Sequence, residues 1–168
     1  DLSGLVVNDL GQPVPGVILS FRSVEDSHRS WITAQSDEAG RIDGGAPEGT
    51  FRANVDLPNT YYDLIEVESP PFRASLNGTV ELKLLMKNPT ARLKVHVVDS
   101  LGQPVTDLPL FAEARITNAL HRTFDYTDEE GLADLGVISG DWTVRFDFDQ
   151  NDPALSLATF GYLATTNR

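Results

Sequence analysis

The stretch Leu10-Gly11-Gln12-Pro13-Val14 returns unchanged as Leu101-Gly102-Gln103-Pro104-Val105, and this repetition decides the fold. The offset is 91 residues (101−10), and it recurs without a gap at Gly40 and Gly131 (131−40). A repeat that keeps one register over this length indicates two copies of one supersecondary plan. The sequence therefore predicts tandem modules, which usually serve to extend a protein or to contact a partner.

The bulk properties are those of a folded, acidic, globular chain. We expect one module over residues 1–88 and a second over residues 89–168, each long enough to bury its own core. The net charge of −12 argues against nucleic acid, whose phosphates need clustered Lys and Arg. No apolar run approaches the roughly 18 residues of a membrane helix, so we expect no membrane insertion. The chain has no cysteine, which excludes disulfides and a thiol nucleophile.

Apolar residues alternate with polar ones at a period of two, which predicts strands throughout and no helix. Residues expected to face the core at matching positions of the two copies are Leu2, Gly4 and Val6 with Leu93, Val95 and Val97; Val17, Leu19 and Phe21 with Leu108, Leu110 and Ala112; and Phe51, Ala53 and Val55 with Trp142, Val144 and Phe146. This pattern is typical of antiparallel sheets that are covered on one face. The expected fold class is all-β, with two tandem Greek-key β-sandwiches.

Turn residues punctuate these strands at the same places in both copies. Asn8 and Asp99 open one turn, and Asp37 and Asp128 open another; each is followed by a glycine that can adopt positive φ. Pro109, inside the second strand of the second copy, suggests an edge strand because proline cannot donate to a ladder.

The connector between the copies is short. Residues 88–91 link the last strand of copy one to the first strand of copy two, and Pro89 stiffens them. We therefore expect an elongated pair of sandwiches, arranged end to end.

The motifs of each copy resemble a known family. They are similar to the carboxypeptidase regulatory-like and collagen-adhesin B-type repeats, which share a transthyretin-like β-sandwich. Invasin-type bacterial immunoglobulin-like repeats carry similar signals and remain an alternative. The matching stretches are Asn8 to Val14, Ser36 to Gly40 and Gly49 to Ala53 in copy one, and Asp99 to Val105, Thr127 to Gly131, Gly140 to Val144 and Gly161-Tyr162 in copy two.

The resemblance implies a non-catalytic module of a larger bacterial protein that is secreted, periplasmic or on the cell surface. Such a module serves as a stalk or spacer, or as an adhesive segment, and its partners are neighbouring domains and a protein or glycan ligand. The alternative is an accessory module of an extracellular hydrolase or peptidase, which binds carbohydrate or orients a catalytic domain. The sequence carries no phosphate loop, no dinucleotide fingerprint and no nucleophile elbow, so we expect no enzyme and no cofactor here.

Two other kinds of reactive group have structural interpretations. His28, His96 and His121 lack the spacing of a shared metal site, and we expect exposed loop or strand residues. Some collagen-adhesin repeats form a Lys–Asn isopeptide bond beside a buried acid, and Lys94 and Glu113 are the candidates. Strand alternation opposes that bond, because Lys94 and Glu113 are out of phase with the apolar faces of their strands.

A structural calcium ion is the metal hypothesis that the sequence allows. Asp147, Asp149 and Asp152 cluster after a strand, and hard cations favour carboxylate ligands in flexible loops. A second acidic group, around Asp128 and Asp134, has the alternative role of closing turns.

The aromatic residues Trp31, Tyr61 and Tyr62 are candidates for a ligand surface, since exposed Trp and Tyr mark recognition sites. The competing interpretation, which we favour, is that they cap one end of the sandwich core. The repeat offset also aligns Arg168 with Asn77 (168−77 = 91). Copy two is therefore expected to lack a counterpart of the strand Val80–Met86 within this chain, or to receive that strand from another chain.

Overall fold

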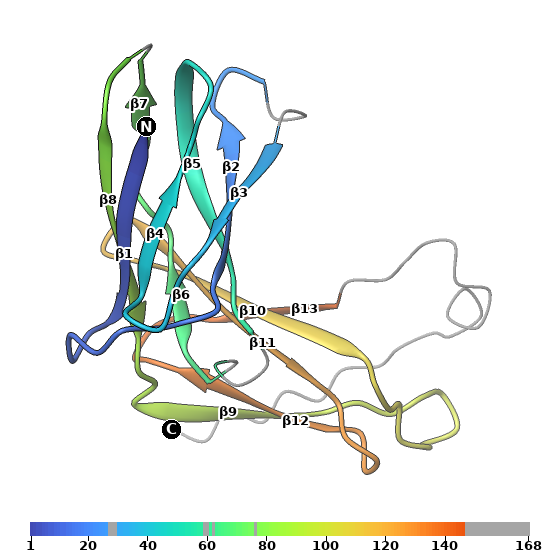
Figure 1. The fold of residues 1–168 in the computed structure, drawn as a ribbon. Coiled ribbons are helices and arrows are strands. Elements are labelled where there is room, and N and C mark those ends of the chain that lie inside the picture. Colours follow the sequence, from blue (N-terminus) through green and yellow to red (C-terminus); the bar gives the residue numbers. More distant parts are fainter. Residues whose placement is uncertain (27–29, 59–60, 62, 76, 147–168) are drawn as a thin grey trace.

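The computed structural model describes residues 1–26, 30–58, 61, 63–75 and 77–146, with the backbone alone described for 30–33. These residues form thirteen strands, and no helix appears among them (Figure 1). No helix in the described part of the chain is long and apolar enough to cross a membrane. The expectation of an all-β chain is confirmed.

The first half is a sandwich of two four-stranded layers. One layer has the spatial order β4 (Arg41–Gly44), β1 (Leu2–Asn8), β8 (Val80–Lys87) and β6 (Ile65–Val67). The other has the order β3 (Ser30–Gln35), β2 (Ile18–Ser23), β5 (Gly49–Asp56) and β7 (Phe72–Ala74). Their inner faces meet around Leu19, Phe21 and Leu84, each at most 1% exposed. The alternation that the sequence shows in these strands therefore marks the core.

The second half repeats this plan with fewer strands in the described residues. One layer has the order β13 (Thr143–Phe146), β10 (Pro109–Ile116) and β11 (Ala119–Tyr126), and the other pairs β12 (Leu132–Val137) with β9 (Ala91–His96). Its core contains Leu110, Ala112 and Leu135, all fully buried, so the core positions expected in β10 are confirmed.

The repeated turns have the same hydrogen bonds in both halves. The Asn8 Oδ1 accepts from the backbone N–H groups of Leu10 (3.1 Å) and Gln12 (2.9 Å). The Asp99 Oδ1 accepts from Leu101 and Gln103, both at 2.8 Å. An Asx side chain that bonds its own loop in this way replaces a backbone turn, as the sequence predicted.

A buried hydroxyl also repeats at the 91-residue offset (127−36). The Ser36 Oγ accepts from the Val17 N–H at 2.9 Å, and the Thr127 Oγ1 accepts from the Leu108 N–H at 2.9 Å. Each hydroxyl satisfies a buried N–H at the start of the second strand, where an unpaired donor is costly.

A single sheet crosses between the two halves. β6 pairs antiparallel with β8 on one side and with β11 on the other, which joins the strands β13-β10-β11-β6-β8-β1-β4 into one seven-stranded sheet. Figure 1 shows the second half at one end of the first, with its strands running across those of the first half. The division into modules at residue 88 stays a prediction, but each half has its own hydrophobic cluster.

Two sequence-based expectations about pairing differ from the structure. Pro109 does not mark an edge, because β10 lies between β11 and β13; it occupies the first position of the strand, where proline is tolerated. The sheets are also not wholly antiparallel, since β8 runs parallel to β1. No hairpin joins these two strands, so turn geometry does not fix their relative direction.

Candidate interaction groove between the two halves

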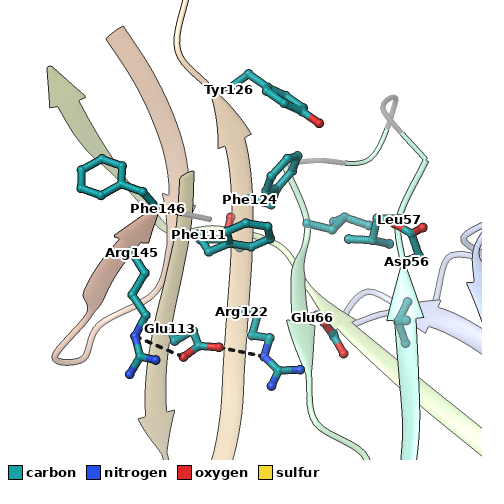
Figure 2. A pocket seen from close by; sticks show the side chains of 13 residues that line it. Asp56, Leu57, Glu66, Phe111, Glu113, Arg122, Phe124, Tyr126, Arg145 and Phe146 are labelled. Atoms are coloured by element: carbon teal, nitrogen blue, oxygen red, sulfur yellow. Dashed lines mark hydrogen bonds and ion pairs between the residues drawn. The ribbon is translucent and has the colours of Figure 1, made fainter. Parts of the chain in front are cut away.

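A groove of about 710 Å³ lies where the second half meets the first. Its lining comes from β5 and β6 and the segment after β5 on one side, and from β10, β11 and β13 on the other (Figure 2). The residues that line it are Val55, Asp56, Leu57, Leu64, Glu66, Phe111, Glu113, Arg122, Thr123, Phe124, Tyr126, Arg145 and Phe146. It combines an aromatic wall with a cluster of paired charges.

The aromatic wall is built by residues that alternate along two paired strands. Phe111 lies directly opposite Phe124, and their ring centroids are 4.7 Å apart at a tilt of 44°. Tyr126 follows two residues later on the same face, and its ring meets Phe124 edge-on at 4.7 Å. These separations are within the range of favourable aromatic pairs. Tyr126 is 46% exposed, so its ring presents a surface to solvent.

The charged part of the groove centres on the Glu113 carboxylate. Arg122 Nε donates to Glu113 Oε1 at 3.1 Å, and Arg145 Nε lies 3.8 Å from Glu113 Oε2 (Figure 2). All three side chains retain solvent contact, so the pairs orient the groups more than they stabilise the fold. Asp56 and Glu66 also line the groove, so its charged residues are three acids and two arginines.

Glu66 brings a carboxyl group from the first half to the same groove. It lies opposite Arg122 across the β6–β11 ladder. Burial raises the pKa of the Glu66 carboxyl above its ordinary value of 4.5, while the charge of Arg122 and a backbone hydrogen bond at Val55 oppose that rise. Desolvation therefore outweighs the nearby positive charge.

His121 is buried, which corrects the expectation of an exposed loop or strand residue. A two-residue hairpin at Thr117 and Asn118, both at positive φ, starts β11 at Ala119 and places His121 within the strand at 1% exposure. Its Nδ1 lies 3.2 Å from the Ala119 oxygen. Burial lowers the pKa of the imidazole. Among described atoms, its Nε2 and the Thr123 Oγ1 have no hydrogen-bond partner.

Sequence reasoning missed the groove, although a signal for it is present in the repeat. At the 91-residue offset, Phe111, Phe124 and Tyr126 replace the polar residues Ser20, Thr33 and Gln35 of copy one. At these three positions the second copy therefore has aromatic residues where the first copy has polar ones. Comparison of the outer faces of the two copies, as well as the inner faces, would have pointed to this surface.

Among the site candidates from the sequence that the structure describes, only Glu113 lines this groove. Tyr61 packs against the first-half core, in line with the capping interpretation. The side chain of Trp31 and the residue Tyr62 lie outside the described residues, as do the calcium candidates Asp147, Asp149 and Asp152.

The other candidate groups have structural roles in the described residues. Lys94 is exposed, as its strand phase predicted, and this does not suit an isopeptide partner, which must be desolvated. The Asp128 Oδ1 accepts from the N–H groups of Glu130 (3.0 Å) and Leu132 (2.8 Å), which explains this acid as a turn residue. No group of three or more His, Asp or Glu side chains in the described part of the chain is placed to hold a metal.

Comparisons with known proteins give distant structural matches. No family model and no curated protein matches the sequence. The chain is similar to the TIE protein of Bacillus anthracis, at 15% identity and a TM-score of 0.41 over 89% of this chain and 28% of that one. It is also similar to a streptococcal ancillary pilin, at 10% identity and a TM-score of 0.40 over 98% of this chain and 58% of that one.

A third match is the minor pilin of Streptococcus agalactiae, at 14% identity and a TM-score of 0.36 over 89% of this chain and 84% of that chain. The chain thus spans less than two thirds of the first two proteins. Identities and TM-scores this low assign no function.

Proposed function

We propose that this chain is a non-catalytic, rigid spacer and interaction segment of a larger bacterial protein that is secreted or on the cell surface. The observation that carries the proposal is the β6–β11 pairing, which continues one sheet from the first half into the second. A spacer needs a fixed geometry between its modules. A continuous backbone ladder supplies that geometry better than a linker alone.

Further contacts support a fixed junction. The Glu68 N–H donates to the Leu120 oxygen at 2.8 Å and extends the ladder beyond β6. Within the connector, the Asn88 N–H donates to Asp9 Oδ1 at 3.3 Å and the Thr90 N–H donates to the Val137 oxygen at 3.0 Å. The connector is therefore tied to both halves.

Small-angle X-ray scattering tests the rigidity. We expect the wild-type profile to match one fixed arrangement of the two halves. Glu68→Pro removes the donor to Leu120 and should broaden the distance distribution. Glu68→Ala is the matched control, because it loses the Arg52 ion pair (3.1 Å) but keeps the N–H. A wild-type profile that needs a broad ensemble of arrangements would refute the spacer proposal.

The aromatic groove favours a second candidate, an accessory module that binds carbohydrate. Exposed Tyr126 beside Phe124 offers the kind of ring surface on which sugars stack, and the Arg and Glu side chains offer hydrogen bonds to hydroxyl groups. A glycan array tests this function. Retention of a glycan that Tyr126→Ala abolishes would support it, and absence of any retained glycan would count against it.

A further inference from the structure

In the described residues, strand β9 is paired on one side only. Its counterpart in the repeat, β1, lies between β4, to which it is antiparallel, and β8, to which it is parallel. β12, the counterpart of β4, occupies the matching side of β9. The described residues place no strand on the side of β9 that matches β8. The first half therefore shows what kind of strand fits the unpaired side.

The backbone of β9 points hydrogen-bonding groups toward that side. The Val97 N–H donates to the Gly131 oxygen at 2.8 Å, as the Val6 N–H donates to the Gly40 oxygen at 2.8 Å in the first half. Backbone groups alternate between the two sides of a strand, so those of Arg92, Lys94 and His96 point away from β12. In the first half, the same side of β1 receives β8: the Val80 N–H donates to the Asp1 oxygen at 3.0 Å.

The side chains of β9 are also less covered than those of β1. Leu93 is only partly buried against the second-half core, whereas its counterpart Leu2 is 2% exposed. In the first half, Leu84 and Met86 of β8 complete the core at 1% and 0% exposure. The described part of the second-half core contains no counterpart of these two side chains.

We propose that the unpaired side of β9 accepts an extended strand from a partner polypeptide. The strand runs parallel to β9, has apolar residues at alternate positions, and carries an acidic residue opposite Lys94. The charge follows from the register, because Glu81 of β8 lies opposite Ser3, and Lys94 replaces Ser3 in the repeat (94−3 = 91). This mode of recognition takes affinity from the backbone ladder and specificity from alternate side chains. It goes beyond the spacer proposal and does not depend on the rigidity of the junction.

The probe is a fluorescent peptide with the sequence of residues 79–88, which contains β8. We expect saturable binding to the full 168-residue chain by fluorescence anisotropy. A peptide of the same composition without the apolar alternation should not bind. Reversing the charge opposite Lys94 with Glu81→Lys in the peptide should weaken binding about two- to fivefold.

Backbone pairing is tested from both strands. Lys94→Pro removes a donor on the unpaired side, where an edge strand tolerates proline, and should weaken binding at least about tenfold. Lys94→Ala is the matched control, because it keeps the N–H and should lose only the charge effect. N-methylation of the peptide at Val80 and Leu82 removes ladder donors without changing the protein, and should have the effect of the proline variant.

Hydrogen exchange identifies the binding side. The amides of Arg92, Lys94 and His96 should exchange rapidly in the free protein and become protected when the peptide binds. Absence of binding to the wild-type chain would overturn the proposal, as would binding that the N-methylated peptide retains. Protection of these amides in the free protein would overturn it too, because it would show that the chain already pairs this side of β9.

Discussion

Replacing Gly131 by alanine should destabilise the second half far more than the same change at Gly102. Both glycines have positive φ, +73° and +80°. At Gly102 an added Cβ meets nothing within 4 Å, so only the left-handed backbone is penalised, by about 1–2 kcal/mol. At Gly131 the Cβ would lie 2.5 Å from the Val97 oxygen and 3.1 Å from the Pro104 Cβ.

The clash at Gly131 involves backbone that cannot move freely. The Val97 oxygen accepts the Val105 N–H at 3.1 Å, and the Val97 N–H donates to Gly131 itself. Overpacking at such a place costs about 1–3 kcal/mol, so the total for Gly131→Ala is about 2–5 kcal/mol. The Gly131→Ala variant should therefore lose about 1–3 kcal/mol more than the Gly102→Ala variant.

Urea denaturation followed by tryptophan fluorescence measures both free energies of unfolding. Gly40 occupies the equivalent place in the first half, with φ +72° and an added Cβ that would clash with the Val6 oxygen. Gly40→Ala should therefore be as damaging as Gly131→Ala. If Gly131→Ala and Gly102→Ala lose the same free energy, the close approach to Val97 is not what requires glycine at residue 131.

Three further changes test groups near the junction and beyond β13. Burial raises the pKa of the Glu66 carboxyl, so ionising this group destabilises the folded state. Glu66→Gln should therefore increase the free energy of unfolding at pH 7. This gain should vanish below pH 4.5, where the carboxyl is protonated in both states, and thermal melts across that pH range can show it. Burial lowers the pKa of His121, so the stability that its neutral form contributes is complete above pH 6.5 and is lost as the pH falls toward the folded-state pKa. His121→Gln should therefore flatten that part of the stability profile, which thermal melts across the same pH range can show. If Asp147, Asp149 and Asp152 hold calcium, added calcium should raise the melting temperature and Asp149→Asn should abolish the rise; a melting temperature indifferent to chelator would contradict that site.

The repeat made the strand plan predictable, because the same local chemistry appears twice. Val17, Leu19 and Phe21 face the core as their alternation predicts, and Asn8 and Asp99 bond their turns as Asx residues do. These features depend on neighbours close in the sequence. A period of two and a turn residue therefore suffice to find them.

Features that depend on distant contacts could not be found in that way. β6 has three residues, too few to show a period, and its pairing with β11 joins Glu66 to Arg122 across more than fifty positions (122−66 = 56). His121 is a polar residue for which the sequence predicts exposure, but its position within β11 buries it. The groove follows from the same junction, and the repeat signals only its aromatic wall, at Phe111, Phe124 and Tyr126.

The seven-stranded sheet has a consequence for how the protein unfolds and how it can be divided. A chain cut at residue 88 would leave β6 without β11 and expose an unpaired edge on the first half. The two copies are thus not interchangeable units: opening one should weaken the other, and denaturation should approach a single cooperative transition. We therefore expect the two copies to behave as one folding unit joined at β6.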